Sequence, residues 1–457
     1  MKKGIPIIIV GILVLSGLGA SAISEKEIKN EVKSIKFPST TYEDEYKMVI
    51  IAPRRFSNNI DPLIEHKNLH GIDTFLKTTE DIYNEYEGRD DAEKVKYFIK
   101  DAIETNNISY VLLIGGRKHQ FFGWNVPVRY VQLDDGFTYP FYMSDLYFSD
   151  IYKNGDEFDD WDSDGDGVFA EWGQDDLDLV PDVCIGRLPC RNRIEVKIVV
   201  NKIINYENNA NGESWFNKAI FVGGDTFPGF GDPFPYEGEE TCDIAASYLE
   251  GFEITKLYAS LGTQSEDELI DALTEGCGFM MTRGRGGTDR VRLPLLDESE
   301  LIILNNKIVP KFKNKDMYPI LVLGQCWNAK FDVCLMNIFK FIQNESYIYE
   351  SDCVPECIGW RMVRRINGGS IATLSNTNTC YGAYGEDDAE LFGGYLAVEV
   401  FRLYGEEEMQ TLGEIHKTTI ENYINTYPAV YSNNIHCKSI QEWILIGDPS
   451  LKIGGYS

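Results

Sequence analysis

The stretch PILVLGQCWNAKFD, residues 319–332, decides the fold. Residues 319–323 are continuously apolar or β-favouring, which predicts a strand buried on both faces of a parallel sheet, and Gly324 interrupts the run. We expect the strand to end at Cys326. Open α/β sheets place their chemistry in the crevice outside the carboxyl ends of the strands. Cys326 is therefore the first candidate nucleophile. The alternative is a buried structural thiol, because free cysteine is among the most buried residue types.

Strand-like runs and amphipathic helical stretches alternate on both sides of this segment. Strands are expected at 47–53, 110–116, 183–186, 218–224, 252–257, 278–282 and 370–376, and helices at 61–70, 91–106, 194–208, 239–250, 266–274 and 411–427. The order strand, helix, strand gives parallel units with right-handed crossovers. The sequence therefore predicts an α/β fold of two adjacent doubly wound subdomains with mainly parallel sheets.

The amino-terminal residues 1–22, MKKGIPIIIVGILVLSGLGASA, have the layout of a secretory signal peptide: two lysines, an apolar core and small residues before the cut. We therefore expect a secreted, extracellular protein. If the segment is retained, its short apolar run makes an amino-terminal membrane anchor the alternative. Beyond it, we expect one α/β subdomain at 23–210 and a second at 211–457, because ANGES at 210–214 interrupts the pattern.

The balance of charge limits the partners of the protein. The 457 residues include 43 lysines and arginines against 72 aspartates and glutamates, a formal net charge of −29. Nucleic acid is therefore not expected as a partner, since phosphate binding needs the opposite sign. Ten cysteines permit disulfides in an exported chain but are too few for a disulfide-framed fold. The spacing of Cys353 and Cys357 suits a local disulfide or two buried thiols.

An acidic loop in the first subdomain has calcium-binding spacing. In WDSDGDGVFAEWG, residues 161–173, Asp162, Asp164 and Asp166 alternate and Gly167 allows a sharp turn, as in the first half of a D-x-D-x-D-G loop. Carboxylate oxygens at this spacing converge on one hard cation. The sequence predicts a structural Ca²⁺ ion here, and the alternative is a solvated acidic turn.

The second half of this loop departs from the calcium pattern. The carbonyl oxygen of Val168 is the expected fourth ligand. The acidic residue usual at the twelfth position is missing, because Gly173 stands there. Its replacement would come from Glu171, Asp175 or Asp176, and we favour Glu171.

Eight segments of the chain together resemble the gingipain family of cysteine peptidases. They are LLIGG (112–116), SDLYFSD (144–150), WDSDGDGVFAEW (161–172), DVCIGRLP (182–189), VGGDTFP (222–228), GQCWNAKFD (324–332), GGSIATLSNT (368–377) and EWILIGDPSLKIGG (442–455). The resemblance implies an amino-terminal α/β subdomain followed by a caspase-like subdomain, and a protein or peptide as substrate. It carries the family's nucleophile over to Cys326.

The same resemblance locates the position of the catalytic base. In the family, a histidine lies in a G-H-G-S-like turn at the end of the strand before the nucleophile strand. The corresponding turn here is GRGG at 284–287, and Arg285 occupies the histidine position. Arginine can stabilise a thiolate or an oxyanion, but with a pKa above about 12 it cannot shuttle a proton near neutrality. Backbone amides of this turn, including that of Gly286, are expected to help bind the oxyanion.

Other side chains offer no clear replacement for the base. The five histidines are His66, His70, His119, His416 and His436, and nothing in their spacing directs them at Cys326. His416 falls on an apolar helical stripe, which favours a core histidine. The cationic loop formed by Arg283, Arg285, Arg290 and Arg292 could bind a carboxylate or form salt bridges within this acidic protein.

Two functions of different classes follow from the sequence. The first is an exported cysteine endopeptidase that hydrolyses peptide bonds through the Cys326 thiolate. The second is a catalytically degenerate relative that binds peptides or has a regulatory or structural role. Both predict a protein or peptide partner and exclude nucleic acid, and neither involves a membrane beyond export unless the signal segment is retained. The sequence does not specify an oligomeric state.

Overall fold

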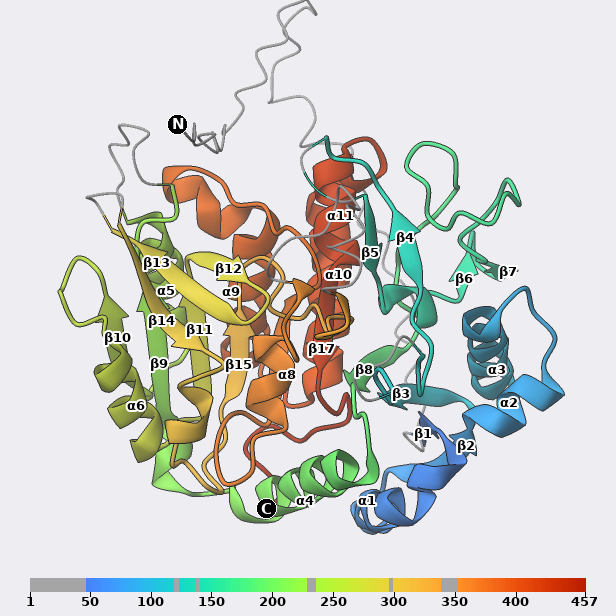
Figure 1. Ribbon diagram of the computed structural model, residues 1–457, viewed down its shortest axis with the longest axis horizontal. Helices are drawn as coiled ribbons and strands as arrows, with labels where there is room; N and C mark the ends of the chain where they lie inside the picture. The colour runs from blue at the N-terminus through green and yellow to red at the C-terminus, as the bar shows by residue number, and fades with distance from the viewer. Residues whose placement is uncertain are drawn as a thin grey trace, which may run out of the picture. The chain divides into compact units, whose positions relative to one another are not determined.

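A ten-stranded sheet forms the core of the protein (Figure 1). Its strands follow in the order β10 (Glu253–Tyr258), β9 (Lys218–Gly223), β11 (Phe279–Arg283), β15 (Ile320–Leu323), β16 (Ala372–Asn376), β17 (Trp443–Ile446), β8 (Cys184–Leu188), β3 (Ile108–Ile114), β1 (Lys47–Ala52) and β2 (Asp73–Thr78). Neighbours are parallel except β16 and β17. The computed structural model describes residues 47–118, 123–136, 138, 140–227, 236–295, 299–337 and 352–457. Its mainly parallel sheet confirms the predicted α/β class.

The sheets expected for the two subdomains form one continuous sheet in the structure, joined at their edges. The last strand of the chain, β17, pairs antiparallel with β16 on one side. On its other side, Ile446 pairs in parallel with Arg187 of β8, and the N–H of Gly447 donates to the Arg187 carbonyl at 3.0 Å. The carboxyl-terminal segment therefore connects the two halves of the sheet.

The strand predicted around residues 319–323 is β15, which lies between β11 and β16. Its residues face two separate cores: Ile320 and Val322 pack in one hydrophobic cluster, Leu321 and Leu323 in the other. All four side chains are fully buried. The continuous apolar run is required because helices cover both faces of the sheet.

Helices lie close to all the predicted positions: α1 (Ser57–Leu69), α3 (Asp91–Asn106), α4 (Arg193–Asn209), α5 (Glu237–Ser247), α6 (Glu266–Glu275) and α10 (Leu412–Thr426). The described residues also form helices that the sequence did not predict: α2 (Thr79–Glu85), α8 (Ile358–Val363), α9 (Phe392–Gly405) and α11 (Asn434–Gln441). Helix α1 begins four residues before the predicted start. A three-stranded antiparallel sheet, β12 (Arg285–Gly287), β13 (Arg290–Pro294) and β14 (Glu300–Asn305), follows β11.

Within the residues that the structure describes, no helix combines the length and the apolar character needed to cross a bilayer. The expected signal segment at 1–22 lies outside the described residues and stays a prediction.

A buried ion pair stabilises the junction of the two halves. The guanidinium of Arg187 is fully buried, and its Nε and Nη2 donate to the carboxylate of Asp145 at 2.7 and 2.8 Å. Its remaining N–H groups donate to the carbonyl oxygens of Gly115 and Pro127 at 3.1 and 3.0 Å. Complete hydrogen bonding offsets the cost of removing both charges from water.

Replacing Arg187 by methionine should lower the free energy of unfolding by about 3–5 kcal/mol, because the Asp145 carboxylate would stay buried without its partner. Urea unfolding measures the loss. Lys100→Met is the matched control, since it breaks the exposed pair with Glu104 and should cost less than about 0.5 kcal/mol. The double variant Arg187→Met/Asp145→Leu should recover part of the loss, and equal losses in the single variant and the control would contradict the role of the pair.

Candidate active site

Cys326 lies at the carboxyl edge of the sheet, three residues after β15 ends at Leu323. It is half-buried, and its Sγ–H donates to the carbonyl oxygen of Cys380 at 3.3 Å. The next residue, Trp327, has a φ of 61°, a left-handed conformation uncommon for residues other than glycine. Its N–H donates to the Asn378 carbonyl at 2.8 Å, which fixes the turn after the thiol. The sulfur therefore lies at the position expected for a strand-end nucleophile, and its catalytic role stays a prediction.

The surroundings of Cys326 favour the neutral thiol. Burial raises the pKa of Cys326, and the carboxyl group of Glu442 raises it further. Glu442 is fully buried, and burial raises its own pKa well above the usual range. The positive charges of Arg283 and Lys438 lower the pKa of Cys326, but by less than burial and Glu442 raise it. Activation of the sulfur therefore requires a proton acceptor.

The glycine turn predicted beside the nucleophile packs directly on it. A Cβ placed on Gly286 would lie 2.0 Å from the carbonyl oxygen of Cys326 and 2.7 Å from its nitrogen, so only glycine fits there. The turn is not a free loop, because Arg285–Gly287 form strand β12 and pair with β13. The structure thus brings Gly286 and Cys326 together. An oxyanion role for the Gly286 amide stays a prediction.

Arg285, which the resemblance places at the histidine position, is bound to neighbouring protein groups. Its Nε donates to the carbonyl oxygen of Thr226 at 3.0 Å, and Nη1 lies 3.5 Å from Oε1 of Glu300. Arg292 also pairs with Glu300, at 2.8 Å, and donates to the Gly286 carbonyl at 3.1 Å. Arg290 pairs with Asp289 at 2.7 Å. Of the two interpretations of the cationic loop, these contacts favour salt bridges within the protein.

Arg283 has a structural role that its sequence position did not indicate. It is fully buried at the end of β11, and its Nε donates to Oδ2 of Asp388 at 2.7 Å. Its Nη2 donates to the other oxygen of Asp388, and Nη1 donates to the carbonyl of Gly324, two residues before Cys326. Asp388 also accepts from Thr241 of α5 at 2.8 Å. One guanidinium thus connects three segments around the thiol.

The histidines within the described residues make contacts elsewhere. Their contacts are His66 Nε2 with Glu207 at 2.9 Å, His70 Nδ1 with the His66 carbonyl at 2.8 Å, His416 Nε2 with the Trp443 carbonyl at 3.2 Å, and His436 Nδ1 with the Tyr423 hydroxyl at 2.8 Å. Burial lowers the pKa of His416 to about 4, in keeping with a core histidine. His119 lies outside the described residues.

The predicted calcium loop brings three of its five proposed ligands together. Carboxylate oxygens of Asp162, Asp164 and Asp166 lie within 4.8 Å of one another. Asp162 is buried and already carries an ion pair with Arg89, and the other two aspartates are exposed. Glu171 does not belong to this group.

The backbone N–H groups of the other two proposed ligand residues form hydrogen bonds within the loop. The Val168 N–H donates to the Asp166 carboxylate at 2.7 Å, and the Glu171 N–H donates to the Asp175 carboxylate at 2.8 Å. A calcium ion in this loop therefore stays a prediction.

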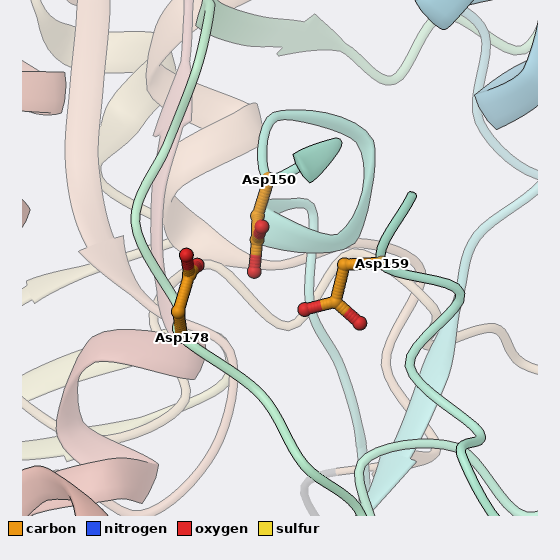
Figure 2. A group of neighbouring side chains, drawn as sticks. All are labelled: Asp150, Asp159 and Asp178. Carbon is orange, nitrogen blue, oxygen red and sulfur yellow. The ribbon is translucent and has the colours of Figure 1, made fainter. Parts of the chain in front are cut away.

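A second acidic cluster, which the sequence pattern did not indicate, lies deeper in the same subdomain. Carboxylate oxygens of Asp150, Asp159 and Asp178 lie within 4.8 Å of one another, and the three side chains point toward a common space (Figure 2). Asp150 and Asp159 are fully buried. Trp161 donates to one oxygen of each, and the other oxygen of each has no hydrogen-bond partner. Folding assembles these residues from separate loops, so no local spacing could reveal them.

Lys96 is a buried cationic group whose charge opposes the rise that burial causes in the pKa of Asp150 and Asp159. Its Nζ has no hydrogen-bond partner and lies 4.4 Å from the ring centroid of Tyr147. Burial lowers the pKa of Lys96 to about 8, and burial raises that of Asp159 to about 6. Burial also raises the pKa of Asp150 well above its usual range, and a divalent cation bound here would favour the ionised carboxylates. Oxygen ligands of this kind suit Ca²⁺.

Of the two interpretations of Cys353 and Cys357, the structure favours thiols without a disulfide. Cys357 is a free, buried thiol, which excludes a bond to Cys353. Burial raises the pKa of Cys357 to about 12.

Comparisons with known proteins give the chain a family. The model of peptidase family C25 matches residues 41–454. Gingipain R2 of Porphyromonas gingivalis is 20% identical over 447 residues, which cover 94% of this chain and 48% of that protein. Gingipain R1 of the same organism is 23% identical over 247 residues, 52% of this chain and 20% of that protein. The chain thus spans about half or less of these relatives' length.

Solved structures show the same fold. The crystal structure of the Arg-specific cysteine proteinase gingipain R is similar with a TM-score of 0.64 and 18% identity, covering 91% of this chain and 80% of that one. The complex of the Porphyromonas gingivalis RgpB pro- and mature domains is similar with a TM-score of 0.62 and 19% identity, covering 89% and 79%. The match of the family model over nearly all of the chain, on a caspase-like fold, means that this protein belongs to peptidase family C25.

Proposed function

We propose that the protein is an exported cysteine endopeptidase in which Cys326 attacks the peptide carbonyl. The observation that carries the proposal is the contact of Gly286 with the Cys326 backbone at the end of β15. It sets a half-buried thiol beside a glycine strand whose amides can face a developing oxyanion. The signal-like residues 1–22 support export.

The reaction would follow thiol peptidase chemistry. The Cys326 thiolate attacks the carbonyl carbon, a C–S bond forms, and the C=O electron pair moves to the oxygen. The C–N bond then breaks, the departing amine takes a proton, and water hydrolyses the thioester. Arg285 cannot exchange that proton near neutrality, and the histidines within the described residues are bonded to other groups. Water must carry it, so turnover should be slow and should rise with pH.

The second candidate is a degenerate relative that binds peptides without cleaving them. The observation in its favour is the pairing of Arg285 with Thr226 and Glu300 at the histidine position. A peptide could still lie along the sheet edge, because loss of the base removes proton transfer and not the binding surface.

The reaction of Cys326 with iodoacetamide should increase about tenfold per pH unit from pH 6 to 8, because the thiolate is the nucleophile and the raised pKa keeps it scarce. Mass spectrometry of the Cys326 peptide measures the rate. Cys190, which is fully buried, is the internal control and should stay unlabelled in the folded protein. Rapid, pH-independent labelling of Cys326 below neutrality would contradict the neutral thiol.

Arg285→His should raise hydrolysis of a mixed peptide library by about 10²–10⁴-fold near neutral pH, since it restores a general base. Arg285→Gln is the matched control, because it removes the same contacts without adding a base. Cys326→Ala should abolish cleavage in every background. Cleavage that survives Cys326→Ala would remove the nucleophile assignment, and activity only after Arg285→His would identify a degenerate enzyme.

We also propose that the protein holds a structural Ca²⁺ ion between Asp150, Asp159 and Asp178. The unpartnered oxygens of Asp150 and Asp159 support this site over the predicted loop, whose Asp162 is paired with Arg89. The ion would neutralise buried charge and connect loops of the first subdomain, without a part in the chemistry.

Chelation by EGTA should lower the thermal midpoint, since calcium at a hundredfold excess over its Kd contributes about 2.7 kcal/mol. Asp159→Asn should remove this calcium dependence, and Asp164→Asn in the exposed loop should retain it. The opposite pattern would assign the ion to the loop at Asp162, Asp164 and Asp166. A midpoint that does not respond to calcium in the unmodified protein would exclude both sites.

A further inference from the structure

Cys326 and Cys380 each contact the backbone of the segment that carries the other. Cys326 Sγ lies 3.3 Å from the carbonyl oxygen of Cys380. Cys380 Sγ lies 3.8 Å from the carbonyl oxygen of Gly324, two residues before Cys326. The carbonyl oxygen of Cys380 is close to the Cα of the same residue, because the C=O bond is about 1.2 Å long and the Cα–C bond about 1.5 Å. Cys326 Sγ therefore lies within about 6 Å of the Cys380 Cα. Cys380 Sγ also lies 3.4 Å from the carbonyl oxygen of Tyr381.

The packing around Cys380 holds its thiol in this position. A Cβ on Gly393, at the start of α9, would lie 2.0 Å from Cys380 Sγ, so the thiol occupies the space that any larger residue would need. Arg283 donates to the same Gly324 carbonyl that the Cys380 sulfur contacts, which brings a cation to this thiol. Arg283 opposes the rise that burial causes in the pKa of Cys380.

These two thiols also differ from most other cysteines in accessibility. Seven cysteines are buried: Cys184, Cys190, Cys242, Cys277, Cys334, Cys357 and Cys437. Cys326, Cys353 and Cys380 are half-buried. A small oxidant can therefore reach the Cys326 and Cys380 pair while the protein stays folded.

We propose that Cys326 and Cys380 form a reversible disulfide that blocks the nucleophile. The inference rests on the proposed function, because it assigns regulation to the same sulfur. The oxidant is a small-molecule disulfide. The Cys326 thiolate attacks one of its sulfurs, forming a mixed disulfide and releasing one small thiol. The Cys380 thiolate then attacks the Cys326 sulfur, which forms the Cys326–Cys380 bond and releases the second small thiol. Two protein thiols are oxidised and one disulfide is reduced to two thiols.

The test uses the full chain, reduced and then equilibrated with glutathione and glutathione disulfide in varied ratios. Non-reducing digestion and mass spectrometry measure the linked Cys326–Cys380 peptide. Iodoacetamide labelling of Cys326 should be lost in proportion to the linked fraction and should return with reductant. In Cys380→Ser and Cys380→Ala, whose folding is checked by thermal unfolding, Cys326 should accumulate as the glutathione adduct. Cys353→Ser is the matched control and should form the link normally.

The inference would be overturned if Cys326 of the unmodified protein formed a glutathione adduct without the disulfide to Cys380. It would also be overturned if both thiols stayed reduced while glutathione disulfide was in excess. Failure of the proposed function is distinguishable from these outcomes. If the disulfide forms and blocks labelling, but the reduced protein cleaves no peptide, the result supports the disulfide and contradicts the peptidase assignment.

Discussion

The site depends on the buried ion pair between Arg283 and Asp388. Two opposite charges removed from water are tolerated only where hydrogen bonds satisfy the remaining donors and acceptors, and here Gly324 and Thr241 complete the set. The pair fixes the end of β11, the residues before Cys326 and the segment after β16 relative to one another. It adds to the contacts that Trp327 makes with the Asn378 carbonyl and that Gly286 makes with the Cys326 backbone.

Two glycines then bring the backbone and sulfur atoms closer than any side chain would allow. Gly286 lets strand β12 contact the backbone of Cys326, and Gly393 leaves room for the thiol of Cys380. The same arrangement makes the site compact and leaves both thiols only partly exposed. Burial of Cys326 favours its neutral form, and the histidines within the described residues are bonded to other groups.

The sequence predicted β9 and β11 to within one residue, because both strands are buried and mostly apolar. Strand β15, which was expected to end at Cys326, ends at Leu323, because Gly324 interrupts the apolar run. The sequence did not predict α9, whose sequence FGGYLAVEVFRLYG is mostly apolar and has two glycines in its first turn. Resemblance, not spacing, located the glycine turn beside Cys326. The partner of Arg283 lies 105 residues away, and Asp150, Asp159 and Asp178 come from separate loops, so only the folded chain could reveal either group.

Strand β17 determines when the two halves of the sheet can pair during folding. It is the last strand in the chain, yet it lies in the interior of the sheet between β16 and β8. Parallel pairing between strands that are distant in the sequence forms slowly, because the chain loses loop-closure entropy before the new contacts stabilise the sheet. The halves of the sheet cannot join until residues 443–446 have left the ribosome. Until then the edges of β16 and β8 lack the β17 partner, and unpaired strand edges favour association with other chains.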